Sequence, residues 1–186
     1  RLKATVVILS HRGRPKGPDA ALSLKADAGD LERMLGAKVV FVPHFRFREI
    51  RKTVRAARPG SVFLLENLRF LRGEEQNDRK LAKQLAELGD IYVNDAFAVS
   101  HRTNASVVAV TKYLRSYAGL ELEREVQSLS KALHPKRPLV VILGGSKVHD
   151  KLGVLEYFKR KADYFLIGGV AANTLLHLKG FDVKKS

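Results

Sequence analysis

The chain has 186 residues, of which 45% are hydrophobic and 28% charged, enough for one large domain or one and a half ordinary ones. It contains no cysteine, which excludes disulfide frameworks and thiolate metal sites and is compatible with the reducing cytoplasm in which we place the protein. No apolar run reaches the roughly 18 residues of a membrane-spanning helix, and the net charge of +15 favours phosphate-bearing partners or a heavily solvated basic surface.

Strand-like and helix-like segments alternate along nearly the whole chain. Short continuous apolar runs predict strands that are covered on both faces, and apolar residues at helical spacing predict helices. In chain order we expect strand 6–9, helix 24–35, strand 38–42, helix 47–57, strand 62–65, helix 78–88, strand 91–93, helix 105–114, helix 121–133, strand 139–143, helix 151–161, strand 164–167 and helix 171–178. This alternation is typical of βαβ units and a mostly parallel sheet.

Helix caps and a break in the pattern define the expected boundaries. Ser23 is the expected N-cap of the first helix, Gly36 follows its last residue, and Asn77 is expected to open the helix at 78–88. The pattern predicts an α/β fold with parallel sheets, in which the helix at 121–133 connects a first domain to a second whose sheet is unfinished. The expected domains are residues 1–118, a connecting helix and hinge at 119–137, and the start of a second domain at 138–186.

Three of the predicted strands run into loops that carry basic and polar residues. Because the carboxyl ends of parallel strands lie along one edge of a sheet, we expect all three loops to face one crevice. A basic loop after a single strand is more often a solvated turn, and Glu66 could simply pair with Arg69 or Arg72. A crevice that gathers several such residues would suit a small, multiply charged anion. Its expected lining is His11, Arg14, Arg69, His101 and Arg102.

A fourth strand ends in Gly144-Gly145-Ser146-Lys147 before a predicted helix. Backbone N–H groups of such a turn, together with the helix N-terminus, favour phosphate binding, and Lys147 and Lys151 add positive charge. The turn is not a Walker A loop, because its spacing differs. The next strand ends in Gly168-Gly169, where the absence of side chains admits a flat ligand, another backbone or tight helix packing.

These motifs, in this order, resemble those of the phosphoglycerate kinase family over essentially the whole chain. The matching segments are Ser10-His11-Arg12-Gly13-Arg14-Pro15-Lys16-Gly17, Leu65-Glu66-Asn67-Leu68-Arg69-Phe70, Gly73-Glu74-Glu75, Val93-Asn94-Asp95-Ala96-Phe97, His101-Arg102 and Leu143-Gly144-Gly145-Ser146-Lys147-Val148. Several motifs in the correct order are far more specific than any one alone.

The resemblance implies two Rossmann-like parallel-sheet domains joined by a hinge helix, both incomplete in this chain. It implies an enzyme, a monomer when full length, that transfers a phosphoryl group between 1,3-bisphosphoglycerate and ADP to give 3-phosphoglycerate and ATP. It implies Mg²⁺ bound with ATP or ADP, with its ligands outside this chain. The family's first strand would precede Arg1 and the rest of its nucleotide domain would follow Ser186, so we expect these residues alone to be inactive. The implied phosphoglycerate ligands are His11, Arg14, Arg69 and Arg102; the implied nucleotide ligands are Gly145, Ser146, Lys147, Lys151, Gly168 and Gly169, with Lys147 catalytic.

The alternative function is a basic α/β module that binds nucleic acid. It depends on the net charge and on basic clusters such as Phe45-Arg46-Phe47-Arg48 and Lys136-Arg137. The sequence has no recognition helix, aromatic stacking motif or RNA-binding signature, and the clusters are typical of solvated helix faces. We therefore expect neither a nucleic-acid partner nor a membrane partner.

Overall fold

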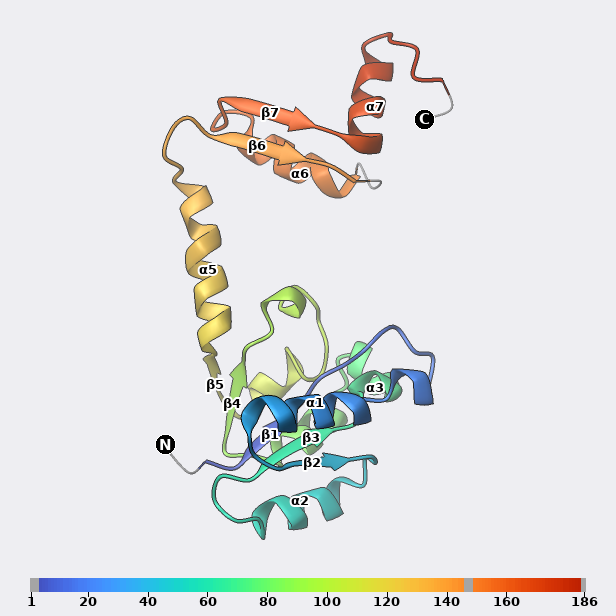
Figure 1. Cartoon of the computed structure of the whole chain (residues 1–186), viewed down its shortest axis with the longest axis vertical. Helices are drawn as coiled ribbons and strands as arrows, with labels where there is room; N and C mark the ends of the chain where they lie inside the picture. The colour runs from blue at the N-terminus through green and yellow to red at the C-terminus, as the bar shows by residue number, and fades with distance from the viewer. Residues whose placement is uncertain (1–3, 146–148, 185–186) are drawn as a thin grey trace. The chain divides into compact units, whose positions relative to one another are not determined.

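The structure, a computed structural model, describes residues 4–145 and 149–184. The chain divides into two compact units, unit 1 ending at Glu125 and unit 2 beginning at Val126 (Figure 1). Every strand pairing in the described residues is parallel, which confirms the predicted α/β class. Within those residues, no helix is both long and apolar enough to cross a membrane.

The largest sheet of unit 1 has three strands in the order β1-β3-β2. They are β1 (Val6–Ile8), β2 (Val39–Val42) and β3 (Val62–Leu65). Along β3, Phe63 and Leu65 pack into one apolar core, while Leu64 packs into a second core on the opposite face. Side chains alternate between the faces of a strand, so a continuous apolar run is what a sheet covered on both faces requires.

Helix α1 (Lys25–Leu35) covers the smaller core, into which Leu24 and Ala28 are buried. Ser23 is not in the N-cap position, which Leu24 occupies, although the Ser23 Oγ still accepts a hydrogen bond from the Lys25 N–H at 3.2 Å. The predicted N-cap is therefore wrong by one residue. The Ser23 hydroxyl also donates a hydrogen bond to the Glu66 carboxylate at the end of β3.

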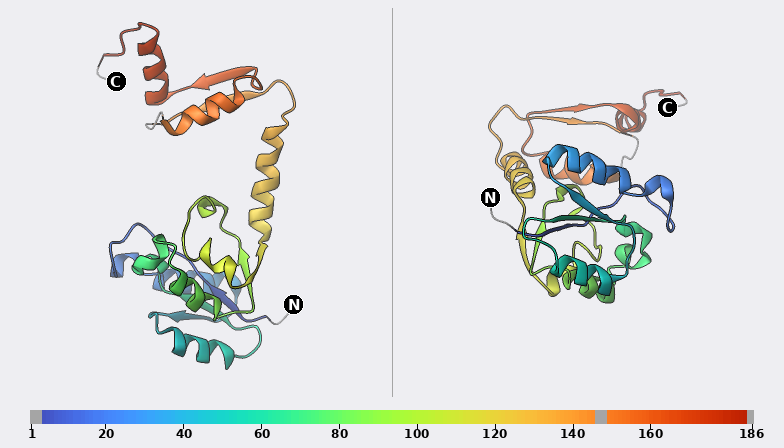
Figure 2. Two further views of the ribbon diagram at one scale, coloured as in Figure 1. Left: turned by 180° about the vertical axis from the view of Figure 1, so that it is seen from behind. Right: turned by 60° about the horizontal axis from the view of Figure 1, so that its bottom comes forward.

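Helices α2 (Phe47–Arg55) and α4 (Arg79–Ala86) pack on the larger core. Ile50 and Val54 of α2 are buried one helical turn apart, as the helical spacing of the sequence predicts. The views of Figure 2 show α1 and α2 on opposite faces of the sheet. Unit 1 is therefore a helix–sheet–helix sandwich around β3.

The expectation that Asn77 opens the fourth helix is wrong. Asp78 is its N-cap, and the Asp78 Oδ1 accepts a hydrogen bond from the Leu81 N–H at 2.6 Å. Asn77 has a positive φ of 53°, and its Oδ1 accepts from the Ala109 N–H at 3.0 Å. Its side chain thus anchors a distant segment instead of its own helix.

The helix predicted at residues 105–114 is also wrong. The segment forms turns and a short 3₁₀ helix, η4 (Ala109–Lys112). The N–H of Ala105 donates to the Glu74 carbonyl at 2.8 Å, and the N–H of Ala109 is taken by Asn77. Ala105, Ala109 and Val110 are buried, so packing favours this conformation over an α-helix.

The strand after α4, β4 (Ile91–Asn94), does not join the three-stranded sheet. It pairs with β5 (Arg115–Ala118), a strand that the sequence did not predict, in a separate two-stranded sheet. All four residues of β5 are exposed, so no apolar pattern marks it. Short helical segments complete unit 1: η1 (Ala20–Leu22), η2 (Leu68–Phe70), α3 (Arg72–Glu75) and η3 (Phe97–Val99).

Asp95, directly after β4, caps helix α5 (Leu120–Leu133). Its Oδ1 accepts hydrogen bonds from the N–H groups of Glu121 and Leu122 at 2.8 and 2.9 Å. A Cβ at Gly119 would lie 2.3 Å from the Asp95 carboxylate, so this tight connection requires glycine. The boundary between the two units lies within α5.

Unit 2 contains a two-stranded parallel sheet with flanking helices. Asp163 links the residues that precede the two strands. Its Oδ2 accepts a hydrogen bond from the Leu139 N–H at 2.6 Å, and its Oδ1 accepts one from the Arg137 Nη1 at 2.5 Å. The predicted strands and helices here are confirmed with shifts at their ends. They are β6 (Val140–Leu143), α6 (His149–Phe158), β7 (Tyr164–Ile167) and α7 (Gly169–Leu178).

The packing of α2 generates a stability prediction. Ile50 is 2% exposed, so we expect Ile50→Ala to lower the free energy of unfolding by about 3 kcal/mol through a lost transfer term and a cavity. Met34 on α1 is 84% exposed, so Met34→Ala should change it by less than about 0.5 kcal/mol. Urea unfolding checks both variants, and equal losses would contradict the packing described.

Candidate functional site

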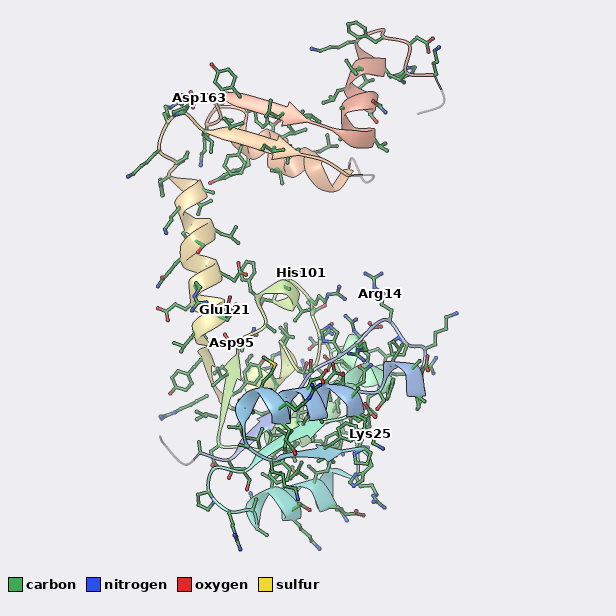
Figure 3. The ribbon with its side chains drawn as sticks, viewed as in Figure 1. Arg14, Lys25, Asp95, His101, Glu121 and Asp163 are labelled. Atoms are coloured by element: carbon green, nitrogen blue, oxygen red, sulfur yellow. The ribbon has the colours of Figure 1, made fainter. Side chains whose placement is uncertain are left out.

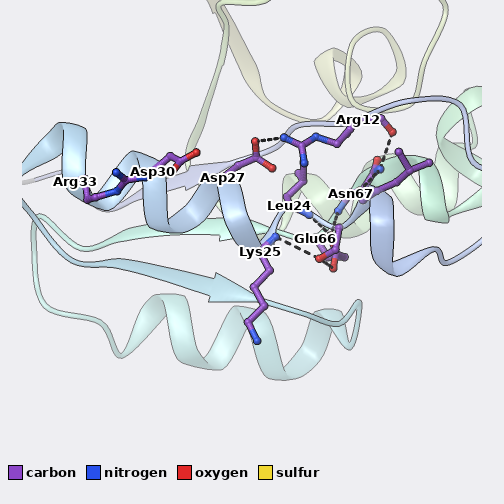
Figure 4. A network of polar contacts seen from close by, with 10 residues as sticks. Arg12, Leu24, Lys25, Asp27, Asp30, Arg33, Glu66 and Asn67 are labelled. Carbon is purple, nitrogen blue, oxygen red and sulfur yellow. Dashed lines mark hydrogen bonds and ion pairs between the residues drawn. The ribbon is translucent and has the colours of Figure 1, made fainter.

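The loop that carries His11 and Arg14 is fastened to the end of β3 by Asn67 (Figure 4). Asn67 is fully buried, and its Nδ2 donates to the carbonyls of Arg12 and Leu22 at 2.8 and 2.9 Å. Its Oδ1 accepts from the Arg69 N–H at 3.1 Å. One buried amide therefore fixes both the loop and the backbone of Arg69, because an unpaired group there would cost free energy.

Glu66, the residue before Asn67, fixes the start of α1. Its carboxylate accepts hydrogen bonds from the Ser23 Oγ at 2.7 Å, the Leu24 N–H at 2.9 Å and the Asn67 N–H at 2.7 Å. The alternative that Glu66 pairs with Arg69 or Arg72 is therefore not what the structure shows. Glu66 and Asn67 act as the local scaffold of this strand end.

Arg69 is buried in η2, yet part of its guanidinium group has no hydrogen-bond partner in the described residues. Its Nη1 donates to the Gly13 carbonyl, and its Nε lies 3.5 Å from the Glu75 Oε1. Neither Nε nor Nη2 forms a hydrogen bond within the part of the chain that the structure describes. Buried donors without acceptors are costly, so they indicate a place where a ligand supplies the acceptors.

Arg102 follows the loop after β4 and has the same property. Its buried Nε lacks a hydrogen-bond partner among the described residues. Burial lowers the pKa of Arg69, and the charges of Arg102 and Arg14 lower it further, so the three cations lie within electrostatic range of one another. Although β4 is outside the three-stranded sheet, its loop reaches the same site.

His11 lies in this positive cluster. Burial lowers the pKa of His11 from 6.5, and the charges of Arg69 and Arg102 lower it further, while Glu74 and Glu75 oppose the shift. Figure 3 shows Arg14 and His101 on the same side of unit 1, where both side chains are exposed. The structure thus brings His11, Arg14, Arg69 and Arg102 within electrostatic range of one another, and the anion site stays a prediction.

In unit 2, the turns after β6 and β7 lie side by side. Gly169 has a φ of 64°, and a Cβ there would lie 3.4 Å from the Gly145 backbone nitrogen. The Gly168 N–H donates to the Leu143 carbonyl at 2.9 Å. The sequence left a flat ligand, another backbone or tight helix packing as reasons for these glycines. At Gly169 the structure shows close approach of another backbone. Ser146, Lys147 and the Lys151 side chain lie outside the described residues.

Glu74 was not predicted as a site residue, although the motif Gly73-Glu74-Glu75 is one of the segments that match the family. Glu74 is 2% exposed, and its charge acts on His11 and Arg69 of the cation cluster. An adjacent pair of acidic residues gives no sign of which one is buried. In the described ranges, no group of three or more His, Cys, Asp or Glu side chains could hold a metal ion.

Comparison with known proteins identifies one family. The sequence model of the family described as phosphoglycerate kinase matches residues 1–186. A curated phosphoglycerate kinase of Desulforapulum autotrophicum is 50% identical over 98% of this chain and 48% of its own length; that of Pseudothermotoga lettingae is 47% identical over 99% and 47%. The chain therefore spans about half the length of the curated relatives it matches.

Solved structures show the same similarity. Phosphoglycerate kinase from Pyrococcus horikoshii OT3 superposes with a TM-score of 0.86 at 33% identity, covering 97% of this chain and 47% of that one. The enzyme from Coxiella burnetii gives a TM-score of 0.81 at 42% identity, covering 99% and 46%.

The environment of His11 generates a pH prediction. Because its pKa in the folded protein lies below 6.5, the unfolded chain binds more protons between the two values. The free energy of unfolding should therefore rise with pH across that window and level off above it. NMR titration of the imidazole and urea unfolding at several pH values check this. In His11→Gln the slope from this group should vanish; an unchanged slope would contradict the assignment.

Proposed function

Because the chain belongs to the phosphoglycerate kinase family, we propose that it forms part of an enzyme that transfers a phosphoryl group between 1,3-bisphosphoglycerate and ADP. The acyl phosphate of 1,3-bisphosphoglycerate gives its phosphoryl group to a β-phosphate oxygen of ADP, and the products are 3-phosphoglycerate and ATP. Unit 1 binds the phosphoglycerate, and unit 2 supplies part of the nucleotide site. The enzyme works in the cytoplasm as a monomer.

The observation that carries this proposal is the set of buried guanidinium nitrogens that have no hydrogen-bond partner among the described residues. Arg69 offers Nε and Nη2, and Arg102 offers Nε. A phosphoglycerate has a carboxylate at one end and a phosphate at the other, so it supplies acceptors for several such donors at once. Arg14 adds an exposed cation, and His11 adds a neutral imidazole at pH values above its lowered pKa.

For the nucleotide, we assign the turns after β6 and β7 of unit 2. Their exposed backbone and the N-terminus of α7 suit phosphate oxygens and a flat base. Lys147 is assigned as the catalytic residue that accompanies the transferring group. The assigned nucleotide ligands are Gly145, Ser146, Lys147, Lys151, Gly168 and Gly169.

The chemistry fits what these residues offer. Phosphoryl transfer requires little covalent help but much positioning and neutralisation of charge, which arginine and lysine side chains provide. Mg²⁺ bound to the nucleotide would neutralise further phosphate charge. We assign the ion no ligand among these residues, as the family resemblance implies.

Ligand-induced thermal stabilisation tests the proposed substrate. A ligand that binds only the folded state stabilises it by about 2.7 kcal/mol at about 100 times its Kd, which raises the melting midpoint. We expect 3-phosphoglycerate to raise the midpoint of the full chain, whereas an oligonucleotide should lose any effect as salt is added. Stabilisation by oligonucleotide that persists in high salt, with none from 3-phosphoglycerate, would favour the nucleic-acid alternative.

Substitution of Arg14 tests the phosphoglycerate clamp, by which we mean the cluster of His11, Arg14, Arg69 and Arg102. Arg14→Ala should weaken 3-phosphoglycerate binding by about 2 kcal/mol, the scale of a lost charge-assisted contact, as measured by calorimetric titration. Arg33→Ala is the matched control, because Arg33 is an 80% exposed cation on α1 that pairs with Asp30. If both variants bind with equal affinity, Arg14 contributes only net charge and is not part of the clamp.

A further inference from the structure

Glu74 is a buried carboxylate that no step of the proposed reaction uses. It lies in α3, just after Arg69 in the chain, and is 2% exposed. Its oxygens accept three hydrogen bonds from one distant segment, residues 104–106. A charge is buried at a cost unless it is well paired, so its position requires an explanation.

The three hydrogen bonds tie α3 to the segment that follows Arg102. The Glu74 Oε1 accepts from the Ser106 Oγ at 2.6 Å and from the Asn104 Nδ2 at 3.2 Å, and the Oε2 accepts from the Ser106 N–H at 3.1 Å. The Glu74 backbone carbonyl accepts from the Ala105 N–H at 2.8 Å. Four contacts from one residue therefore fix the loop of Arg102 against the element that follows Arg69.

The charge of Glu74 also acts on the cluster. It opposes the lowering of the pKa of both His11 and Arg69, which are otherwise affected most by burial. Burial raises the pKa of Tyr92 to about 12, and the charge of Glu74 adds to that shift. Because the charge of Glu74 acts on Arg69, it offsets part of the repulsion that Arg102 exerts on Arg69.

Glu74 is too buried to contact a ligand in solvent, and its oxygens already face donors of the protein. Its effect on a substrate must therefore pass through the residues that it holds. Glu75 differs, because its carboxylate is 57% exposed and lies 3.5 Å from the Arg69 Nε. The two neighbouring glutamates therefore differ in role. Glu75 contacts Arg69 directly, whereas Glu74 fixes the spacing between Arg69 and Arg102.

We propose that Glu74 is a positioning residue of the phosphoglycerate clamp: its buried carboxylate holds the segment after Arg102 in register with Arg69 and compensates part of the charge of Arg69 before the ligand binds. This inference rests on the proposed function, because the clamp is the site that Glu74 would organise. Precise placement of such groups depends on the residues that support them.

Glu74→Gln tests the inference, since it keeps the shape of the side chain but removes its charge and faces an amide toward the Ser106 donors. We expect the Kd of the full chain for 3-phosphoglycerate to rise about tenfold, from the loss of charge-assisted hydrogen bonds. Glu87→Gln is the matched control: it removes the same charge from a 44% exposed carboxylate that pairs with Arg51 on α2, so its effect should stay below about threefold. Equal losses in both variants would overturn the inference in favour of net charge alone.

Ser106→Ala provides a milder second variant that should fold even if Glu74→Gln does not. It removes one hydrogen bond to Glu74 and should raise the Kd by about threefold. If Glu74 acts through Ser106, the double variant should bind much as Glu74→Gln does, because effects within one network are not additive. Additive losses, or none in Ser106→Ala, would overturn the inference.

Measurements without ligand separate this inference from the proposed function. In Glu74→Gln, hydrogen exchange at the Ser106 amide should accelerate about tenfold while the amides of β3 stay protected. The pKa of His11, which faces Arg69, Arg102, Glu74 and Glu75, should fall further below 6.5. If wild type does not bind 3-phosphoglycerate, the proposed function fails; if wild type binds and these readouts do not change in the variant, only the role of Glu74 fails.

Discussion

The site of unit 1 depends on one constraint: like charges must be held close together before any anion is present. Burial and the neighbouring Arg102 both lower the pKa of Arg69, which shows that the cluster is held against its own repulsion. The opposing free energy comes from the hydrogen bonds of two buried side chains: Asn67, just after β3, fastens one loop, and Glu74, in α3, fastens another. The alternating core around β3 holds these anchors in place.

Elements whose sequence pattern is determined by burial could be predicted. β3 is a continuous apolar run because it is covered on both faces, and α2 shows helical spacing because one face is buried. The segment 105–114 also shows helical spacing, but its amides are taken by groups distant in sequence, which no local pattern reveals. β5 could not be predicted because it buries none of its four residues.

The cations of the site could be predicted because their identities and order along the chain are specific. What could not be predicted is how they are held. The partners of Glu66 are Ser23 and Leu24, far earlier in the sequence, so a local pairing with Arg69 was an equally reasonable hypothesis. Similarly, the burial of Glu74 depends on three-dimensional packing against residues 104–106, which the acidic pair in the sequence does not encode.

The capping of α5 by Asp95 has a mechanical consequence. Asp95 directly follows β4 and precedes the loop of Arg102, and it bonds the first turn of a helix that continues past the boundary between the units. Because a Cβ at Gly119 would overlap with the Asp95 side chain, the backbone before α5 is packed directly against Asp95. The loop that leads to Arg102 and the fourteen-residue helix α5 therefore start from one shared point, the Asp95 carboxylate at the end of β4.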